Sequence, residues 1–120
     1  MATISGIALV TGAGSGKRRL CSNTIAKFGR LDVAVNCAGV VGPPAISVDL
    51  DLEEANRVMK IDFRGTFLFS RAEIRAMTGN EPSHLGDVPG QRGAVVNIAS
   101  NLAFMAKPGS RKLRILCVSD

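Results

Sequence analysis

Three short apolar runs, separated by a glycine-rich turn, helical stretches and loops, dominate the pattern along the chain. Residues 4–10, 32–36 and 94–99 are nearly continuous apolar segments rich in Val, Ile and Ala. Such runs are typical of strands that are buried on both faces of a parallel sheet. Residues 17–28 place apolar side chains at helical spacing, and Gly29 follows as a C-terminal stop. The pattern predicts two strands joined by a helix, and a third strand further along.

The longest predicted helix lies between the second and third strands. Asp51 is placed to cap its N-terminus, and Glu53 and Glu54 bring negative charge to its first turn, where the helix dipole favours it. Apolar residues continue at helical spacing, and Gly65 permits a bend or a close helix contact. These apolar positions are Val58, Ile61, Phe63, Phe67, Ile74 and Met77. Residues 79–93 are polar and rich in Gly and Pro, which predicts a surface loop.

Length and composition limit the protein to one domain. At 120 residues with 46% hydrophobic content, the chain can form a modest core but has no room for a separate substrate domain. Its apolar runs are far too short to span a bilayer, and residues 1–5 lack the basic start of a signal peptide. We therefore expect a soluble, cytoplasmic α/β protein.

The net charge of +5 raises the question of a nucleic-acid or membrane partner. Six of the 15 basic residues form two short clusters, at residues 17–19 and 111–114, and neither cluster has aromatic residues placed to stack on bases. We predict no nucleic-acid and no membrane partner.

No motif for a metal site is found. The three cysteines, Cys21, Cys37 and Cys117, are widely spread and form none of the close pairs of zinc or dithiol sites. The acidic residues around Asp51 lack the glycine of a calcium loop and suit a helix N-terminus instead. We assign no metal.

The turn after the first strand is the first feature that suggests a ligand-binding site. Gly12, Gly14 and Gly16 lie between a strand and a helix, where unpaired backbone N–H groups and the positive end of the helix dipole suit the pyrophosphate of a dinucleotide. A Cβ would block that approach. Glycine-rich turns also serve as plain connectors, so the turn alone leaves both interpretations open.

Four motifs in order resemble those of the short-chain dehydrogenase/reductase family. Residues 11–16 (TGAGSG) resemble its TGxxxGxG turn, and residues 36–39 (NCAG) resemble its NNAG segment. Residues 60–67 (KIDFRGTF) are similar to its VNxxGxF helix, and residues 95–100 (VVNIAS) to its serine-bearing strand. The resemblance implies an incomplete Rossmann-like parallel sheet of about three core strands with flanking helices. It further implies an oxidoreductase that uses NADP or NAD and acts on a small-molecule alcohol or ketone.

The same resemblance assigns the site residues. It implies that Ser100 is the surviving catalytic residue. The implied cofactor-binding residues are Gly12, Gly14 and Gly16 at the pyrophosphate, Asn36 and Gly39 on the ribose and nicotinamide side, and Arg71 by family position. The basic residues 17–19 favour NADP only slightly, and neither the substrate nor the cofactor preference is specified.

Two departures concern the cofactor side of the site. Arg18 occupies the position of the last glycine of the family's turn, where a long cation replaces a residue that lets the helix pack closely on the strand. Leu20 also runs almost directly into residues 24–32, which resemble the end of a later helix. A block with two strands and the residue that reads the adenosine ribose is missing between them.

Two further departures concern catalysis. Asp62 stands where the family has an asparagine that organises the proton relay. The chain contains no tyrosine, and the spacing at which the family places its Tyr and Lys falls near Leu113 and Cys117. The only histidine, His84, lies in the polar loop and is interpreted as a surface residue. Since the phenolic acid–base group is absent, we predict an inactive or impaired enzyme.

The missing block has a topological consequence. Both remaining crossovers step in the same direction across the sheet, so right-handed connections place their helices on the same face. The other face is predicted to be apolar, exposed and destabilising. Alternate residues of the set Ile7, Leu9, Val33, Val35, Val95 and Ile98 would line it.

The predicted domain organisation is a partial Rossmann dinucleotide-binding domain over residues 1–110 and an unrelated tail over residues 111–120. Two alternatives to an enzyme stay open. One is a non-enzymatic dinucleotide-binding protein that forms a homodimer, or pairs with an intact relative, through the helix of residues 49–77. Phenylalanines at helical spacing in that helix suit either a core or a dimer contact. The other is a mis-spliced product without function.

Overall fold

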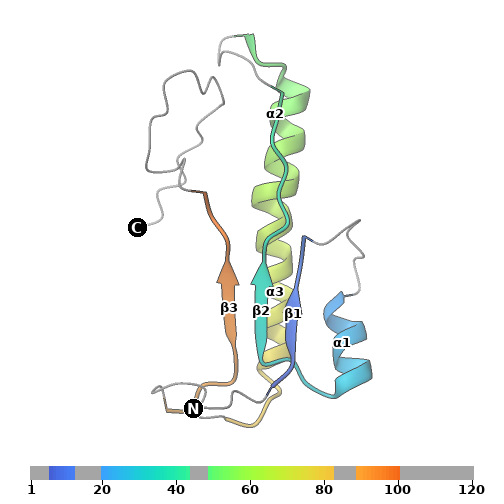
Figure 1. Ribbon diagram of the computed structural model, residues 1–120, viewed down its shortest axis with the longest axis vertical. Coiled ribbons are helices and arrows are strands. Elements are labelled where there is room, and N and C mark those ends of the chain that lie inside the picture. Colours follow the sequence, from blue (N-terminus) through green and yellow to red (C-terminus); the bar gives the residue numbers. More distant parts are fainter. Residues whose placement is uncertain (1–5, 13–19, 44–48, 83–88, 101–120) are drawn as a thin grey trace.

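A computed structural model gives the architecture of the chain, and Figure 1 shows it as a ribbon. The structure describes residues 6–12, 20–43, 49–82 and 89–100. Along the chain the elements are β1 (Ala8–Val10), α1 (Leu20–Phe28), β2 (Val33–Asn36), α2 (Leu52–Met59), the π-helical turn η2 (Lys60–Gly65), α3 (Thr66–Met77) and β3 (Ala94–Asn97). All three predicted strands and both predicted helical regions are present.

The strands form one parallel sheet in the order β1-β2-β3. Ala8 pairs with Val33, and Val33 pairs with Ala94, so equivalent positions of the three strands lie in straight rows across the sheet. Their β-branched composition suits a pleated, buried surface. The α/β fold with about three core strands is confirmed.

The helices lie on one face of this sheet. α1 packs against β1, α3 packs against β2 and β3, and the two helices contact each other. Figure 1 shows α3 behind the strands, α2 continuing beyond their carboxyl ends, and α1 beside β1. Right-handed crossovers that step in one direction require this arrangement.

The core is small because it fills only the space between this face and the helices. Its buried apolar side chains are Leu9, Leu31, Ala34 and Met77, with Leu20, Cys21, Ile25, Ala76 and Val95 packed partly buried around them. A core of this size provides limited hydrophobic stabilisation.

The opposite face of the sheet is apolar and is not covered by any described helix or strand. Because successive side chains of a strand point to opposite faces, the residues next to the core residues in sequence lie on this open face. Two rows across the sheet form it, Ala8 with Val33 and Ala94, and Val10 with Val35 and Val96. Val10 and Ile98 are more than half exposed. We call these residues the open sheet face. It includes Val33, Val35 and Ile98 of the predicted set, whereas Leu9 and Val95 face the helices.

The ends of the helices follow the sequence signals. Asp51 caps α2, its side chain accepting a hydrogen bond from the Glu53 backbone N–H at 3.3 Å. α1 ends at Phe28, and the following Gly29 adopts a positive φ of 78° and donates its N–H to the Ile25 carbonyl at 2.8 Å. None of the described helices is both long and apolar enough to cross a membrane.

The predicted apolar positions of the long helix are only partly correct. Met77 is buried, but Phe63, Phe67 and Ile74 are each more than half exposed. Glu73 is fully buried in place of its neighbour Ile74. The π-helical turn η2 ends at Gly65, and its extra residue per turn rotates the following helix relative to a regular helical pattern. Helical spacing alone therefore did not show that these three residues lie away from the core.

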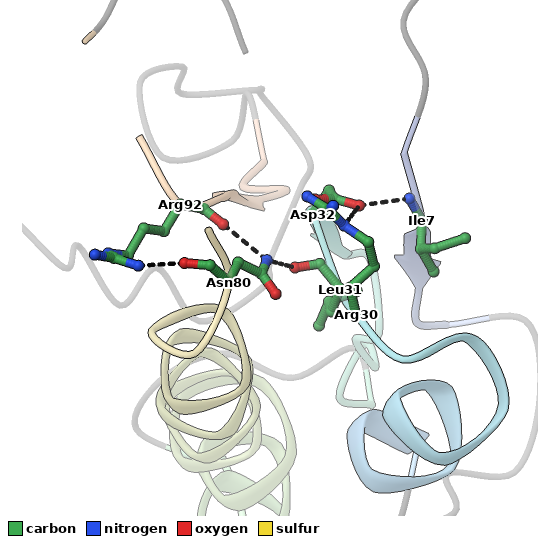
Figure 2. A network of polar contacts seen from close by, with 6 residues as sticks. All are labelled: Ile7, Arg30, Leu31, Asp32, Asn80 and Arg92. Carbon is green, nitrogen blue, oxygen red and sulfur yellow. Dashed lines mark hydrogen bonds and ion pairs between the residues drawn. The ribbon is translucent and has the colours of Figure 1, made fainter. Parts of the chain in front are cut away.

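A polar network joins the amino ends of the strands, at the edge opposite the candidate site (Figure 2). The buried Asp32 carboxylate accepts the Ile7 N–H at 2.8 Å and forms an ion pair with Arg30 at 2.6 Å. The Asn80 amide, beyond α3, donates to the Leu31 carbonyl at 2.6 Å and to the Arg92 carbonyl at 2.9 Å. The network fixes α3 and the first residues of all three strands relative to one another.

Candidate functional site

The carboxyl ends of the three parallel strands meet at one edge of the sheet. In open α/β sheets, ligands bind outside this edge. The segments that leave the strands are tied together there: the Thr11 N–H donates to the Val35 carbonyl, and the Ile98 N–H donates to the Asn36 carbonyl, both at 2.9 Å. The turn, the NCAG segment and the segment leading to Ser100 therefore share this carboxyl edge.

Gly12 lies directly against the NCAG segment. Its φ is +99°, a conformation that residues with a side chain rarely adopt. A Cβ at this position would lie 2.9 Å from both the carbonyl carbon and the carbonyl oxygen of Cys37, and 3.0 Å from the Ala38 nitrogen. Glycine is therefore required here for the turn to pack on the NCAG segment. The other two glycines of the predicted set, Gly14 and Gly16, lie outside the described residues.

Asn36 is buried at the centre of a polar cluster below this edge. Its Oδ1 accepts a hydrogen bond from the Thr11 hydroxyl at 3.3 Å. Its Nδ2 donates to Glu73 Oε2 at 2.9 Å and to Asn97 Oδ1 at 3.0 Å, and Ser70 Oγ lies 3.4 Å away. The side chain thus connects the ends of all three strands to α3, and its amide points into the protein.

Glu73 and its neighbours in this cluster were missed in the sequence. Burial raises the pKa of the Glu73 carboxyl, although the hydrogen bond from Asn36 acts in the opposite direction. Burial also raises the pKa of the Cys21 thiol on α1, and the nearby Glu73 adds to that effect. The available signal was an asparagine at matching positions of two strands, Asn36 and Asn97, since buried amides require partners.

Gly39 and Asp62 meet on the other side of the carboxyl edge. The Asp62 carboxylate, in η2, accepts the Val40 N–H at 2.9 Å. A Cβ at Gly39 would lie 3.6 Å from Asp62 Oδ1, which is an ordinary contact, and Gly39 has no positive φ. Asp62, the departure from the family's asparagine, therefore holds the loop that follows β2.

Arg71 and Ser100 are both exposed. Arg71 lies on α3, next in sequence to Ser70 of the polar cluster, and Ser100 lies three residues beyond the end of β3. Other residues singled out in the sequence lie outside the described part, namely Arg18, His84, Leu113 and Cys117. Backbone groups, an exposed guanidinium and a hydroxyl are the groups that this edge offers to a ligand. No cluster of metal-binding side chains occurs among the described residues.

Comparisons with known proteins agree with this geometry. The sequence model of one family, described as short chain dehydrogenase, matches residues 15–111. The chain is 39% identical over 92 residues to 3-hydroxyacyl-CoA dehydrogenase type-2 of Rattus norvegicus, and these cover 69% of this chain and 32% of the relative. It is 33% identical over 93 residues to (+)-borneol dehydrogenase 2 of Salvia officinalis, covering 77% of this chain and 29% of the relative.

Solved structures show the same partial match. A short chain dehydrogenase from Mycobacterium smegmatis aligns with a TM-score of 0.60 and 34% sequence identity, over 73% of this chain and 32% of the other. A short-chain dehydrogenase/reductase from Serratia marcescens aligns with a TM-score of 0.59 and 25% identity, over 73% and 31% of the two chains. The chain thus spans about a third of the length of the proteins that it matches.

Proposed function

Because the chain belongs to the short chain dehydrogenase family, we propose that its carboxyl edge binds a nicotinamide dinucleotide and supports little or no turnover. The family is one of oxidoreductases that generally use NAD or NADP. In this proposal Gly12, Gly14 and Gly16 approach the pyrophosphate. Gly39 lies on the ribose and nicotinamide side, and the exposed guanidinium of Arg71 contacts the cofactor.

The observation that carries the proposal is the packing of Gly12 on the backbone of Cys37. The turn and the NCAG segment are the first two of the four motifs of the resemblance, and they lie against each other at the edge where α/β proteins bind dinucleotides. A side chain at Gly12 would separate them. In this proposal Asn36 supports the site from inside the protein, because its amide is hydrogen-bonded to Glu73 and Asn97 there.

The proposed site has fewer of the groups needed for catalysis than of those needed for cofactor binding. When bound, the dinucleotide supplies the hydride acceptor or donor. Ser100 would hold the oxygen of an alcohol or ketone substrate. The chain contains no tyrosine to exchange the proton of that oxygen. We therefore propose that turnover is absent or severely impaired.

Substrate and cofactor preference follow only in part from the relatives. The names of the two dehydrogenases above refer to a hydroxyacyl thioester and to borneol, two hydroxyl compounds of very different shape. They support an alcohol or ketone as the substrate class and do not select one. The basic residues 17–19 favour NADP only slightly, so the proposed cofactor is NADP or NAD.

The domain limits are part of the proposal. We propose that residues 1–110 form the partial dinucleotide-binding domain and that residues 111–120 are a tail unrelated to it. The family match ends at residue 111, which is consistent with this division.

A second candidate function is pairing without catalysis, with another copy or with an intact relative. The observation that favours it is the exposure of apolar side chains on the long helix: Phe63, Phe67 and Ile74 are each more than half exposed. Phe67 and Ile74 are seven residues apart and lie on one side of α3. Two such helices could bury these side chains against each other.

Two measurements on the purified protein separate these functions. Fluorescence titration with NADPH and NADH tests binding, and nicotinamide absorbance in the presence of secondary alcohols or ketones tests turnover. The proposal expects saturable binding with no turnover above the protein-free rate. Turnover would contradict the impaired site, and dimers without any dinucleotide binding would favour the pairing function.

A further inference from the structure

The polar cluster below the carboxyl edge contains a buried acid with too few partners. Glu73 has no exposed surface. Its Oε2 accepts one hydrogen bond, from Asn36 Nδ2 at 2.9 Å. Its Oε1 is buried and receives no hydrogen bond from the part of the chain that the structure describes. An ionised carboxylate has about four acceptor sites, so a single N–H donor leaves most of them unsatisfied.

No described cation compensates this acid. The elements packed against α3 are η2, α1, β2 and β3. From β2 and β3 the cluster contains only the neutral amides of Asn36 and Asn97. From α1 the titratable group near Glu73 is the thiol of Cys21, whose pKa Glu73 helps to raise. The charged residues of the described packing elements are Lys27 on α1 and Lys60, Asp62 and Arg64 on η2. None of these side chains, nor Arg71 or Arg75 on α3 itself, forms a hydrogen bond or ion pair with Glu73 in the described structure.

The cluster is also a link between the strands that build the candidate site. Asn36 Nδ2 reaches Glu73 and Asn97 at 2.9 and 3.0 Å, and Ser70 Oγ donates to Asn97 Oδ1 at 3.2 Å. Asn36 Oδ1 accepts from Thr11, the residue before Gly12. A change at Glu73 therefore reaches the turn of the candidate site through two hydrogen bonds.

From this geometry we infer that Glu73 is held as a neutral carboxylic acid, and that only this protonated form positions the carboxyl edge through Asn36. Loss of the proton to solvent would leave a buried, uncompensated negative charge among amides and hydroxyls. That charge would favour separation of α3 from the strand ends, which lets water reach the carboxylate. Glu73 is thus a proton-linked positioning residue. Its effect on dinucleotide affinity rests on the proposed function, whereas its protonation and its effect on stability do not.

The test compares the melting temperature of three proteins between about pH 5 and pH 8. The wild type should lose about 5 °C or more across this range, because the folded state keeps the Glu73 proton while the unfolded state releases it, so the folded state becomes less stable as the pH rises. Glu73→Gln should show a much smaller loss, since its amide keeps an acceptor for Asn36 and cannot ionise. Glu81→Gln, a change at an exposed glutamate, should follow the wild type. Equal pH profiles for the wild type and Glu73→Gln would overturn the inference.

A second measurement needs no variant. With glutamate labelled by 13C at the side-chain carboxyl, the chain gives four signals, from Glu53, Glu54, Glu73 and Glu81. One of them should keep the chemical shift of a protonated acid up to near-neutral pH. If all four titrate in the ordinary range of exposed glutamates, the inference fails even if Glu73→Gln does not fold.

The link to the site is tested with NADPH at about pH 6 and pH 8. Wild-type affinity should fall by about threefold or more at the higher pH, while the affinity of Glu73→Gln changes less. If both proteins bind NADPH with the same pH dependence, Glu73 does not position the site. If the wild type binds at neither pH, the proposed function fails, and the melting and carboxyl titrations still decide whether Glu73 is protonated.

Discussion

Gly12 and Cys37 are in direct backbone contact, although 25 positions separate them in the sequence. A Cβ on Gly12 would come within 2.9 Å of the Cys37 carbonyl, a distance at which atoms must move apart. This contact brings the first two family motifs together at the carboxyl edge. It gives Gly12 a steric role within the protein that is separate from any contact with a ligand.

Gly12→Ala should therefore lower the free energy of unfolding by more than conformational strain alone. A left-handed backbone costs an alanine roughly 1–2 kcal/mol, and the clash with Cys37 adds to that. Gly29→Ala is the matched control, because Gly29 also has a positive φ, 78°, but its Cβ would meet nothing within 4 Å. Urea denaturation measures both. Equal losses for the two variants would show that the Gly12 contact can relax.

Asp32, at the amino edge of the sheet, should make the folded state less stable as the pH falls. Glu73 should make it less stable as the pH rises. The hydrogen bonds from Arg30 hold the pKa of Asp32 below its ordinary value, and the Ile7 N–H adds to this effect. A lowered folded-state pKa stabilises the fold above the unfolded-state pKa, and the stabilisation is lost as the pH falls through the lowered value. Asp32→Asn should cost about 1–3 kcal/mol near neutral pH, because the charged hydrogen bonds are weakened.

The difference in unfolding free energy between the wild type and Asp32→Asn should shrink as the pH is lowered below about 4. Urea denaturation at several pH values measures this difference. Figure 2 shows the contacts of Asp32 on which it depends. A constant difference down to the lowest pH at which both proteins fold would contradict the role of the Asp32 charge.

The open sheet face should bind hydrophobic dyes. Val10 and Val96 both lie on it, so the double change Val10→Thr and Val96→Thr should reduce dye fluorescence. Because both side chains are exposed and threonine suits strands, each change should alter stability by less than about 0.5 kcal/mol. Leu9→Thr, one residue from Val10 but buried under the helices, should cost about 2–4 kcal/mol. Undiminished dye binding by the double variant would show that the dye binds elsewhere.

The sequence predicted the sheet better than the side chains between the sheet and the helices. Short apolar runs, Gly29 and Asp51 are local signals, and the elements they mark are present. The one-sided arrangement followed from chain direction and crossover hand, which are also independent of side-chain detail.

The orientation of α3 could not be predicted, because it depends on the π-helical turn at residues 60–65. Such a turn has no strong local signal, and it exposes Phe67 and Ile74 while it buries Glu73. The polar cluster around Asn36 was missed for the same reason. Its members come from β2, β3, α3 and the residue that follows β1, and only their placement in the fold shows that they meet.

The most direct test of the proposed function is a titration of the purified protein with NADPH and NADH that follows nicotinamide fluorescence and the melting temperature together. A ligand that binds only the folded state raises the melting temperature as its concentration exceeds the Kd. We predict saturable binding and a concentration-dependent rise for the wild type and for Gly29→Ala, and the loss of both for Gly12→Ala. Absence of binding and of any rise in the wild type, while the protein is folded, would contradict the assignment of the carboxyl edge as a dinucleotide site.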